Sequence, residues 1–475
     1  MDGPLHTQVT SAFEVVAGAV PKPGASAQVR FNYVLDLFQA ALPASFFRKL
    51  ESESGLPPGR RRIFTLPLVV WLMIVQRLDR KATLSKAVEQ VVQKRPVGLL
   101  SDHKRIREGT VACHTGAYSD ARKAMPVEVA YQVANQVFDY FLQTRREALV
   151  GFQRPVFVLD GSSLTAPHTG ALVKAYPPAG GDRAISHWPV LRILVAHELT
   201  SGIAARPCWG PMYGEHAVSE QTLTEQIIGH LPANSVFLGD INFGVFTVAF
   251  AATQRHHDVL LRLEANRARA IAGGLPLTPG MDQQVSWRPS PYERKRHPSL
   301  PADACVHGRS IVRQVQASNG ETVTLYLFTT LDLPVEQIVE LYGQRWEVET
   351  DLRSLKRTLN LHMLSCKTPD MIAKELVLAV TAYNVVRAIM SLAAERADLD
   401  PRQLSYSRSE DVVTGALPGL DVAGSEAEYQ TKVARMLYLV ASCKLPNRKR
   451  PSVPRQAWRR PSSKFPSRKA LLAEK

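Results

Sequence analysis

The sequence of residues 334–361 is that of a helix, and four of its side chains suit phosphate chemistry: Tyr342, Arg345, Glu349 and Lys356. At about 100° per residue, these four positions share a strip roughly 60° wide on one helical face. A carboxylate there could hold a metal ion while the neighbouring cations neutralise a phosphate group. The strip could equally be a solvated face on which Arg345 and Glu349 form a surface ion pair. The spacing alone leaves both interpretations open.

Two apolar segments upstream of this helix each end in an aspartate. The first reads PVFVLD and ends at Asp160, and the second reads SVFLGD and ends at Asp240. Apolar runs without alternation are typical of strands buried on both faces. Adjacent parallel strands place such carboxylates side by side at one sheet edge, and Glu349 could supply a third. An aspartate at a strand end is also a common turn or cap residue, so neither residue is conclusive by itself.

Three carboxylates with open coordination positions would suit a hard divalent cation. Mg²⁺ prefers oxygen ligands and usually retains water or substrate phosphate in its remaining positions, and Mn²⁺ can occupy similar sites. Two such ions can serve phosphodiester transfer by stabilising both the attacking and the leaving oxygen. The residues therefore indicate a candidate site for metal-dependent chemistry on a phosphodiester.

The overall charge favours a polyanionic partner. The 475 residues carry a formal net charge of +15 with a pI of about 9.7, which is typical of proteins that bind nucleic acid or an anionic membrane surface. The longest apolar run, residues 66–75, is too short to span a bilayer, and the N-terminus lacks the pattern of a signal peptide. The five cysteines form no CxxC pair, so we expect neither a disulfide framework nor a zinc site. A cytosolic protein in a reducing compartment, without membrane contact, is the default expectation.

The spacing of apolar residues changes near residue 150 from a helical pattern to one of alternating strands and helices. Helical apolar spacing fills the first part, whereas strands and helices alternate after it, with Ser219 as a helix N-cap. A Pro-, Gly- and Arg-rich stretch then interrupts the pattern and is too long for a bare loop. We expect a flexible N-terminus (residues 1–30) and a helical DNA-binding domain (31–150). A catalytic domain (151–395) with a β-rich insertion (266–322) would follow. The chain would end in a C-terminal helical region (396–443) and a basic tail (444–475) that is disordered when free.

With these features in order, the sequence resembles the DDE transposases of the insertion-sequence-four family. FVLDGSSL at 157–164 and LGDINFGVF at 238–246 resemble the segments around that family's two aspartates. Tyr342, Arg345, Glu349 and Lys356 fit the family's Y-x₂-R-x₃-E-x₆-K signature at every spacing. The resemblance extends over residues 155–392.

The resemblance implies an α/β fold with an RNase H-like mixed sheet, helices on both faces, a mostly β insertion before the glutamate helix and a helical N-terminal domain. It implies cut-and-paste DNA transposition in which Asp160, Asp240 and Glu349 hold two Mg²⁺ ions, with Mn²⁺ as a possible substitute. Each transposon end would be nicked to give a 3′-hydroxyl, which in this family can form a hairpin before strand transfer. Tyr342, Arg345 and Lys356 would contact phosphates beside the scissile bond.

Some members of this family stack an inserted tryptophan on a flipped-out base. Trp287 is the candidate for that role, and Tyr292 is second. An aromatic residue in the core of the insertion is an equally good interpretation of Trp287. The partners implied are double-stranded DNA, as terminal inverted repeats and as target, and a second copy of the chain in a synaptic dimer.

Three other functions fit parts of the sequence. A metal-dependent nuclease or resolvase on the same fold would cleave DNA without joining it. A transposase-derived regulator would bind DNA without catalysis, although three intact carboxylates argue against it. A carboxylate-pair glycoside hydrolase would explain Asp160 and Glu349 but neither the charge nor the strip of Tyr, Arg and Lys.

Overall fold

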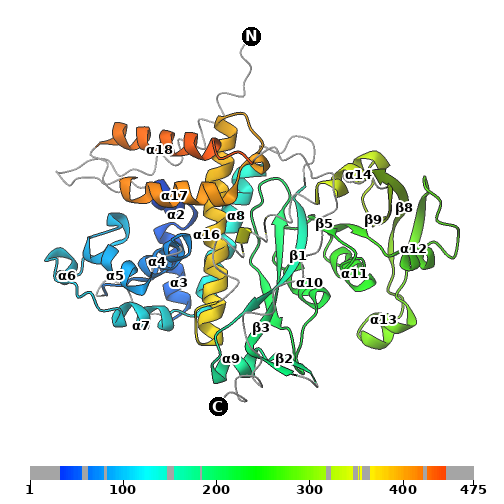
Figure 1. The fold of residues 1–475 in the computed structure, drawn as a ribbon, viewed down its shortest axis with the longest axis horizontal. Coiled ribbons are helices and arrows are strands. Elements are labelled where there is room, and N and C mark those ends of the chain that lie inside the picture. Colours follow the sequence, from blue (N-terminus) through cyan, green and yellow to red (C-terminus); the bar gives the residue numbers. More distant parts are fainter. Residues whose placement is uncertain are drawn as a thin grey trace, which may run out of the picture. The chain divides into compact units, whose positions relative to one another are not determined.

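The computed structural model describes residues 33–55, 62–79, 83–146, 154–181, 184–316, 322–345, 351, 354–355, 364–420 and 425–445. The chain divides into two compact units (Figure 1). Unit 1 comprises residues 1–149, 358–360 and 373–445, and unit 2 comprises residues 150–357, 361–372 and 446–475.

Unit 1 is helical. Its N-terminal part contains α2 (Tyr33–Ala41), α3 (Ala44–Glu53), α4 (Leu66–Leu78), α5 (Leu84–Val92), α6 (Lys104–Arg107), α7 (Gly116–Ala124) and α8 (Val127–Arg146). Its C-terminal part contains α17 (Tyr406–Leu420), α18 (Glu426–Ala441) and most of α16 (Pro369–Arg396). The sequence-based division placed residues up to 395 in the catalytic domain, whereas residues 373–445 pack with the N-terminal helices in the structure.

Helix α16 is the central apolar helix of unit 1. It is long and apolar enough to cross a bilayer, but 94% of its most apolar window is buried inside the protein. Its buried Glu375 accepts a hydrogen bond from Arg77 at 2.8 Å. Its buried Lys374 donates to the carbonyl oxygens of Arg122 and Lys123, near the C-terminal end of α7. These interactions are those of a core helix that joins the two ends of the chain in one unit.

Unit 2 is built on a nine-stranded mixed sheet. The strands are β1 (Val156–Thr165), β2 (Pro178–Gly181), β3 (Ala184–Glu198), β4 (Cys208–Pro211), β5 (Val236–Gly239), β6 (Asp258–Arg262), β7 (Asp282–Trp287), β8 (Val306–Gln316) and β9 (Thr322–Thr329). Their order is β2-β3-β1-β5-β6-β9-β8-β7, with β4 paired to β3. Strands β1, β5 and β6 are parallel to one another, and the other pairs are antiparallel. This arrangement confirms the predicted RNase H-like α/β fold.

Helices cover both faces of this sheet because its central strands are apolar on both sides. The described helices of unit 2 that surround the sheet include α9 (Gly170–Ala175), α10 (Glu220–Ile228), α11 (Phe246–Thr253), α12 (Ala265–Ile271), α13 (Pro291–Arg296) and α14 (Val335–Gly343). Ile338 and Tyr342 of α14 pack with Val158 and Leu238 on one face, whereas α10 approaches Gly161 from the other. The hydroxyl of Ser219 caps α10 by accepting from Thr222 N–H at 3.1 Å, as predicted.

The predicted insertion continues the main sheet. Between β6 and β9 lie α12, β7, α13 and β8, and β9 pairs with both β6 and β8. The insertion is therefore partly helical, and its strands extend the sheet from the β6 side. Its position next to β6 matters because β6 ends beside the candidate site.

Candidate active site

Asp160 lies within β1, and Asp240 directly follows the last residue of the neighbouring parallel strand β5. The register of β1 and β5 pairs Val156 with Val236 and Val158 with Leu238. Two residues further along each strand, the same register places Asp160 beside Asp240. Side chains alternate along a strand, and adjacent strands lie about 4.8 Å apart. This alternation directs Asp160 to the face on which Val158 packs with α14. The expectation that Asp160 ends its strand is wrong, because β1 continues to Thr165.

A tight turn holds the backbone of Asp240. The backbone N–H groups of Phe243 and Gly244 both donate to the carbonyl oxygen of Asp240 at 3.1 Å. Its side-chain Oδ1 accepts from Asn242 N–H at 2.9 Å. The carboxylate thus retains a free oxygen atom in the described contacts while its rotamer is held by the turn. A fixed, partly exposed carboxylate is a suitable ligand for a hard cation.

Arg262 is a site residue that sequence reasoning missed. The register of β5 and β6 pairs Leu238 with Leu260, so two residues further on Arg262 falls opposite Asp240. Asp160, Asp240 and Arg262 therefore follow one another across three parallel strands. The only signal in the sequence was the equal length of the segments VFLGD and DVLLR, which becomes informative once the strands are known to pair.

Tyr342 and Arg345 stand above this row, at the C-terminal end of α14. The Arg345 guanidinium lies 5.8 Å from the centroid of the Tyr342 ring, and Tyr342 is only 2% exposed. Burial raises the pKa of Tyr342, the charges of Arg345 and Arg262 lower it, and the charge of Asp240 raises it again. These couplings place Tyr342 close to Asp240 and to both arginines. The predicted phosphate contact through the tyrosine hydroxyl is hindered by its burial.

A further carboxylate reaches the site from the opposite face of the sheet. Glu220, the first residue of α10, lies against the Cα atom of Gly161, where a Cβ atom would come within 2.3 Å of its Oε1. It forms an ion pair with Arg192 at 3.6 Å. Burial raises the pKa of Glu220, Arg192 opposes this shift and Asp240 adds to it. The missing side chain of Gly161 therefore admits Glu220 on the other face of the sheet, where its charge is coupled to that of Asp240.

The predicted third ligand and the last cation are not visible in this site. Glu349 and Lys356 lie outside the described residues, since α14 ends at Gly343 and residues 346–350 and 356–363 are not described. Within the described ranges, no three His, Cys, Asp or Glu side chains are grouped to hold a metal ion. Asp160 and Asp240 nevertheless supply oxygen donors of the kind that Mg²⁺ and Mn²⁺ prefer. The described donors fit part of such a site.

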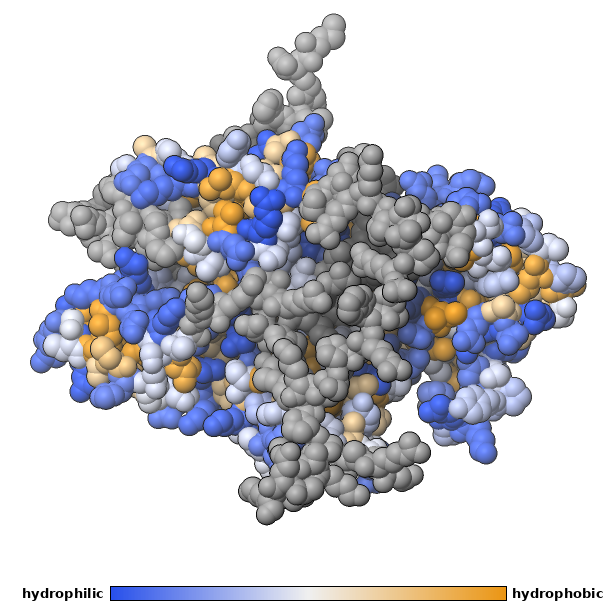
Figure 2. Space-filling model, viewed as in Figure 1, coloured by the Kyte–Doolittle hydropathy of each residue, from blue (hydrophilic) through white to orange (hydrophobic). Residues whose placement is uncertain are grey.

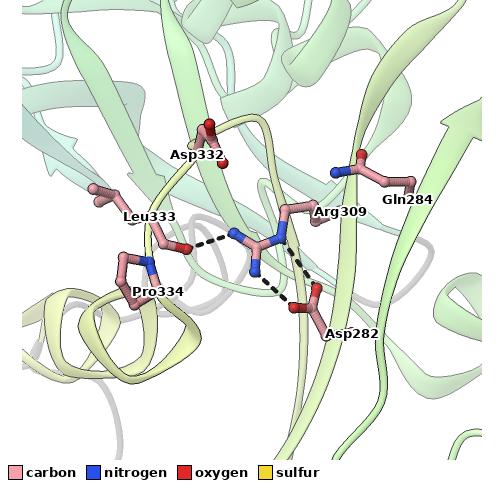
Figure 3. Close-up of a pocket in the computed structure, with 6 residues that line it drawn as sticks. All are labelled: Asp282, Gln284, Arg309, Asp332, Leu333 and Pro334. Atoms are coloured by element: carbon pink, nitrogen blue, oxygen red, sulfur yellow. Dashed lines mark hydrogen bonds and ion pairs between the residues drawn. The ribbon is translucent and has the colours of Figure 1, made fainter.

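A pocket of about 520 Å³ lies at the other end of α14 (Figure 3). Its lining residues are Asp282, Gln284, Arg309, Asp332, Leu333 and Pro334. Arg309 of β8 binds both carboxylate oxygens of Asp282, at 3.1 and 2.7 Å, and donates to the carbonyl oxygen of Leu333 at 2.5 Å. The guanidinium thus ties β7 and β8 to the chain just before α14. The hydrogen bonds of Arg309 therefore hold the start of the helix that carries Tyr342.

Trp287 lies in the core of unit 2. It is 3% exposed and packs edge-on against Phe328 at 4.8 Å and Phe246 at 6.0 Å between ring centroids. A buried ring has no free face on which a base could stack. Of the two interpretations of Trp287, this position fits the aromatic core residue and not the DNA contact, because β7 directs Val285 and Trp287 inward and Ser286 between them outward.

Replacing Trp287 with phenylalanine tests this core position. The smaller ring leaves a void between Phe246 and Phe328, so we expect the free energy of unfolding to fall by about 1–2 kcal/mol. An aromatic that stacked on DNA would tolerate this change, because any aromatic ring offers a stacking face. Denaturant titration measures the stability. A weakened affinity for DNA at unchanged stability would show that Trp287 is a contact residue.

The fold and the site define a class of protein. Two aspartates side by side on parallel strands of an RNase H-like sheet, with arginines next to them, are a suitable arrangement for enzymes that act on nucleic acid phosphodiesters. Comparison with known proteins gives a narrower result. The family model described as "Transposase DDE domain" matches residues 151–385.

A curated relative extends the similarity beyond that domain. "Transposase InsG for insertion sequence element IS4" of Escherichia coli (strain K12) is 26% identical over 428 residues, which cover 86% of this chain and 89% of the relative. The chain therefore belongs to the DDE transposases of the insertion-sequence-four family. It is an enzyme that acts on DNA, and its family implies dependence on a divalent metal ion.

Proposed function

We propose that this protein is a DNA transposase that moves an insertion sequence by cut-and-paste, through phosphodiester hydrolysis and strand transfer at the transposon ends. The observation that carries the proposal is the register that sets Asp160 beside Asp240 under α14. Asp160 and Asp240, together with Glu349, would hold two Mg²⁺ ions, which Mn²⁺ could replace. When bound, these ions would stabilise the charge that develops on the phosphate and on the attacking and leaving oxygens.

The protein's own residues orient and neutralise the DNA in this proposal. Arg345 and Arg262 lie near Tyr342, as Asp240 does. The two arginines would bind the non-bridging oxygens of the phosphate next to the cleaved bond, and Lys356 would add a further cation. Tyr342 is buried under Arg345, so we assign it the role of holding that guanidinium in place. Glu220 would keep the Gly161 side of the site closed to water.

We assign recognition of the transposon ends to the helical residues 31–150. Basic side chains are exposed there in and around α6, including Lys104, Arg105 and Arg107. Two ends must be cut and joined together, so we further propose a homodimer in the synaptic complex, acting on DNA in the bacterial cytosol. The basic segment 444–475 could add DNA contacts.

The experiment that tests the proposal uses the full-length protein with Mg²⁺ and duplexes copied from the DNA that flanks the gene. Uncut duplexes should be nicked at the element boundary to leave a 3′-hydroxyl. Pre-cut duplexes should then be joined to a supercoiled plasmid, which is scored as joined product on a gel. A nuclease or resolvase would cut the first substrate and give no joined product from the second, and that result would overturn the transposase proposal.

A further inference from the structure

Helix α13 is a short helix whose conformation is fixed from several sides. The hydroxyl of Ser290 accepts from Glu293 N–H at 3.2 Å, while the Glu293 carboxylate accepts from Ser290 N–H at 2.8 Å. This reciprocal capping box satisfies two backbone donors at the start of the helix. Arg294 donates to the carbonyl oxygens of Pro301 and Ala302 at 3.1 and 2.9 Å. The helix is therefore held in place without using its outward side chains.

The outward side of α13 combines an exposed aromatic ring with exposed basic side chains. Tyr292 is 66% exposed, the largest exposure among the large apolar residues described in unit 2. The Arg296 guanidinium lies 5.7 Å from the ring centroid and donates to the tyrosine hydroxyl at 3.1 Å. Lys295 is exposed beside it, and Arg288 is exposed just before the helix. We call Arg288, Tyr292, Lys295 and Arg296 the α13 face.

The α13 face projects from the sheet and is hydrophilic on the side in view. In Figure 1, α13 stands apart from the strands, below α11 and α12. Figure 2 shows a mostly hydrophilic projection at the same place. The Tyr292 ring offers an apolar surface at the edge of these cations that a partner could cover. Its pairing with cations indicates a partner that offers both negative charge and a flat or apolar surface.

The anchoring of α13 relates this face to the candidate active site. The Glu293 carboxylate also accepts from Phe246 N–H at 3.3 Å, and Phe246 begins α11 directly after the turn formed by Asp240 and Gly244. The Glu293 carboxylate thus caps α13 through one oxygen atom. Its other oxygen atom accepts from the backbone just after the Asp240 turn. A ligand in the active site that extends past this turn would meet α13.

We propose that the α13 face binds the sugar–phosphate backbone of the transposon-end duplex on the flank of the cleaved bond. Lys295 and Arg296 each neutralise a phosphate, and the Tyr292 ring holds Arg296 and covers a sugar. These contacts carry no sequence information and fix the duplex relative to Asp240. The inference rests on the proposed function, because it takes the end duplex as the substrate of the same site.

The salt dependence of DNA binding tests this contact directly. Binding of a fluorescent end duplex and of a random duplex is measured from 50 to 300 mM KCl. For the double variant Lys295→Ala/Arg296→Ala, the slope of log association constant against log salt becomes less negative by about 2 for both duplexes. Affinity at the lower salt concentrations falls by roughly tenfold or more. Tyr292→Ala weakens binding several-fold, and Tyr292→Phe, which retains the ring, does not.

Arg255→Ala is the matched control. Arg255 is an exposed arginine just beyond the C-terminal end of α11, whereas Glu293 docks at the N-terminal end of that helix. This variant should leave the salt slope of the wild type unchanged. Ser290 and Glu293 are intact in all variants, and melting temperatures confirm folding. The single variant Lys295→Gln, with an expected slope change of about 1, gives an independent measurement.

The outcomes for α13 and for the proposed function are separable. If the α13 variants have the slope of the wild type, or if Arg255→Ala changes it equally, the α13 face does not bind the duplex. If wild-type protein binds the ends with the expected slopes but neither cleaves nor joins them, the transposase proposal fails while the α13 contact stands. A slope change for the random duplex but not for the end duplex would assign α13 to target DNA and overturn the inference.

Discussion

Replacing Asp240 with asparagine abolishes cleavage of the transposon end and leaves binding to that end intact. The amide oxygen of the asparagine can still accept the hydrogen bond that Oδ1 receives from Asn242 N–H at 2.9 Å. The turn that carries residue 240 is therefore retained, and only the negative charge is lost. Because that charge is proposed to hold the divalent metal ions, we expect the cleavage rate to fall by about 10³-fold or more.

The measurement is a time course of nicking with Mg²⁺ on the end duplex, accompanied by a binding titration of the same duplex. Asp303→Asn is the control, because Asp303 is an exposed carboxylate of the insertion and its loss removes the same charge elsewhere in unit 2. Persistent cleavage by the Asp240 variant would contradict the metal-binding role of this residue. Loss of binding as well as of cleavage would point instead to a misfolded turn.

The aspartates of this site were predictable because their signal is local. Each ends an apolar run, and this feature can be identified without knowing which strands pair. The sharp turn predicted after both is found only after Asp240, because β1 continues past Asp160 to Thr165. Arg262 could not be identified in this way. It becomes a neighbour of Asp240 only through the register of β5 and β6, and a basic residue at a strand end has no distinctive type or spacing.

For Trp287 the sequence left two interpretations open. The resemblance to a family with a stacking tryptophan suggested a DNA contact, and a core aromatic was an equally good interpretation. The alternation in QVSW, with Val285 and Trp287 two residues apart, was the signal for an inward-facing pair on a strand. Burial depends on which surface covers the strand, and here Phe246 and Phe328 come from distant parts of the sequence. Tyr292, five residues later, has no such cover.

The sequence predicted one continuous helix over residues 334–361, and the structure describes a helix in the first part of this range. Helix α14 ends at Gly343, with Gln344 as its C-cap. The shared helical strip therefore holds for Tyr342 and Arg345, whose side chains do meet. Glu349 and Lys356 lie outside the described residues, so their place on that strip remains a prediction from spacing.

Replacing Gly244 with alanine damages both the stability and the activity of unit 2. A Cβ atom at this position would lie 2.1 Å from the carbonyl oxygen of Arg262 and 3.1 Å from its carbonyl carbon. Arg262 cannot retreat, because it pairs with Leu327 in the middle of the sheet. The turn must move instead, and Gly244 N–H is bonded to the carbonyl oxygen of Asp240. The displacement is thus passed on to the carboxylate.

We expect Gly244→Ala to lower the free energy of unfolding by about 1–3 kcal/mol, which is the usual cost of forcing an atom into a packed interior. Cleavage should fall by roughly 10²-fold even under conditions where the variant is folded, since a shift of about 1 Å in a catalytic group can cost that much. Denaturant titration measures the first effect, and nicking of the end duplex at a temperature well below unfolding measures the second.

Gly170→Ala provides the comparison, because Gly170 begins α9 with no atom within 4 Å of its added Cβ. Its stability should change by less than about 0.5 kcal/mol and its cleavage should not change. If Gly244→Ala were stable but inactive, the turn would have moved without loosening the fold. If it were active at the wild-type rate, the close approach of this turn to β6 would not be what positions Asp240.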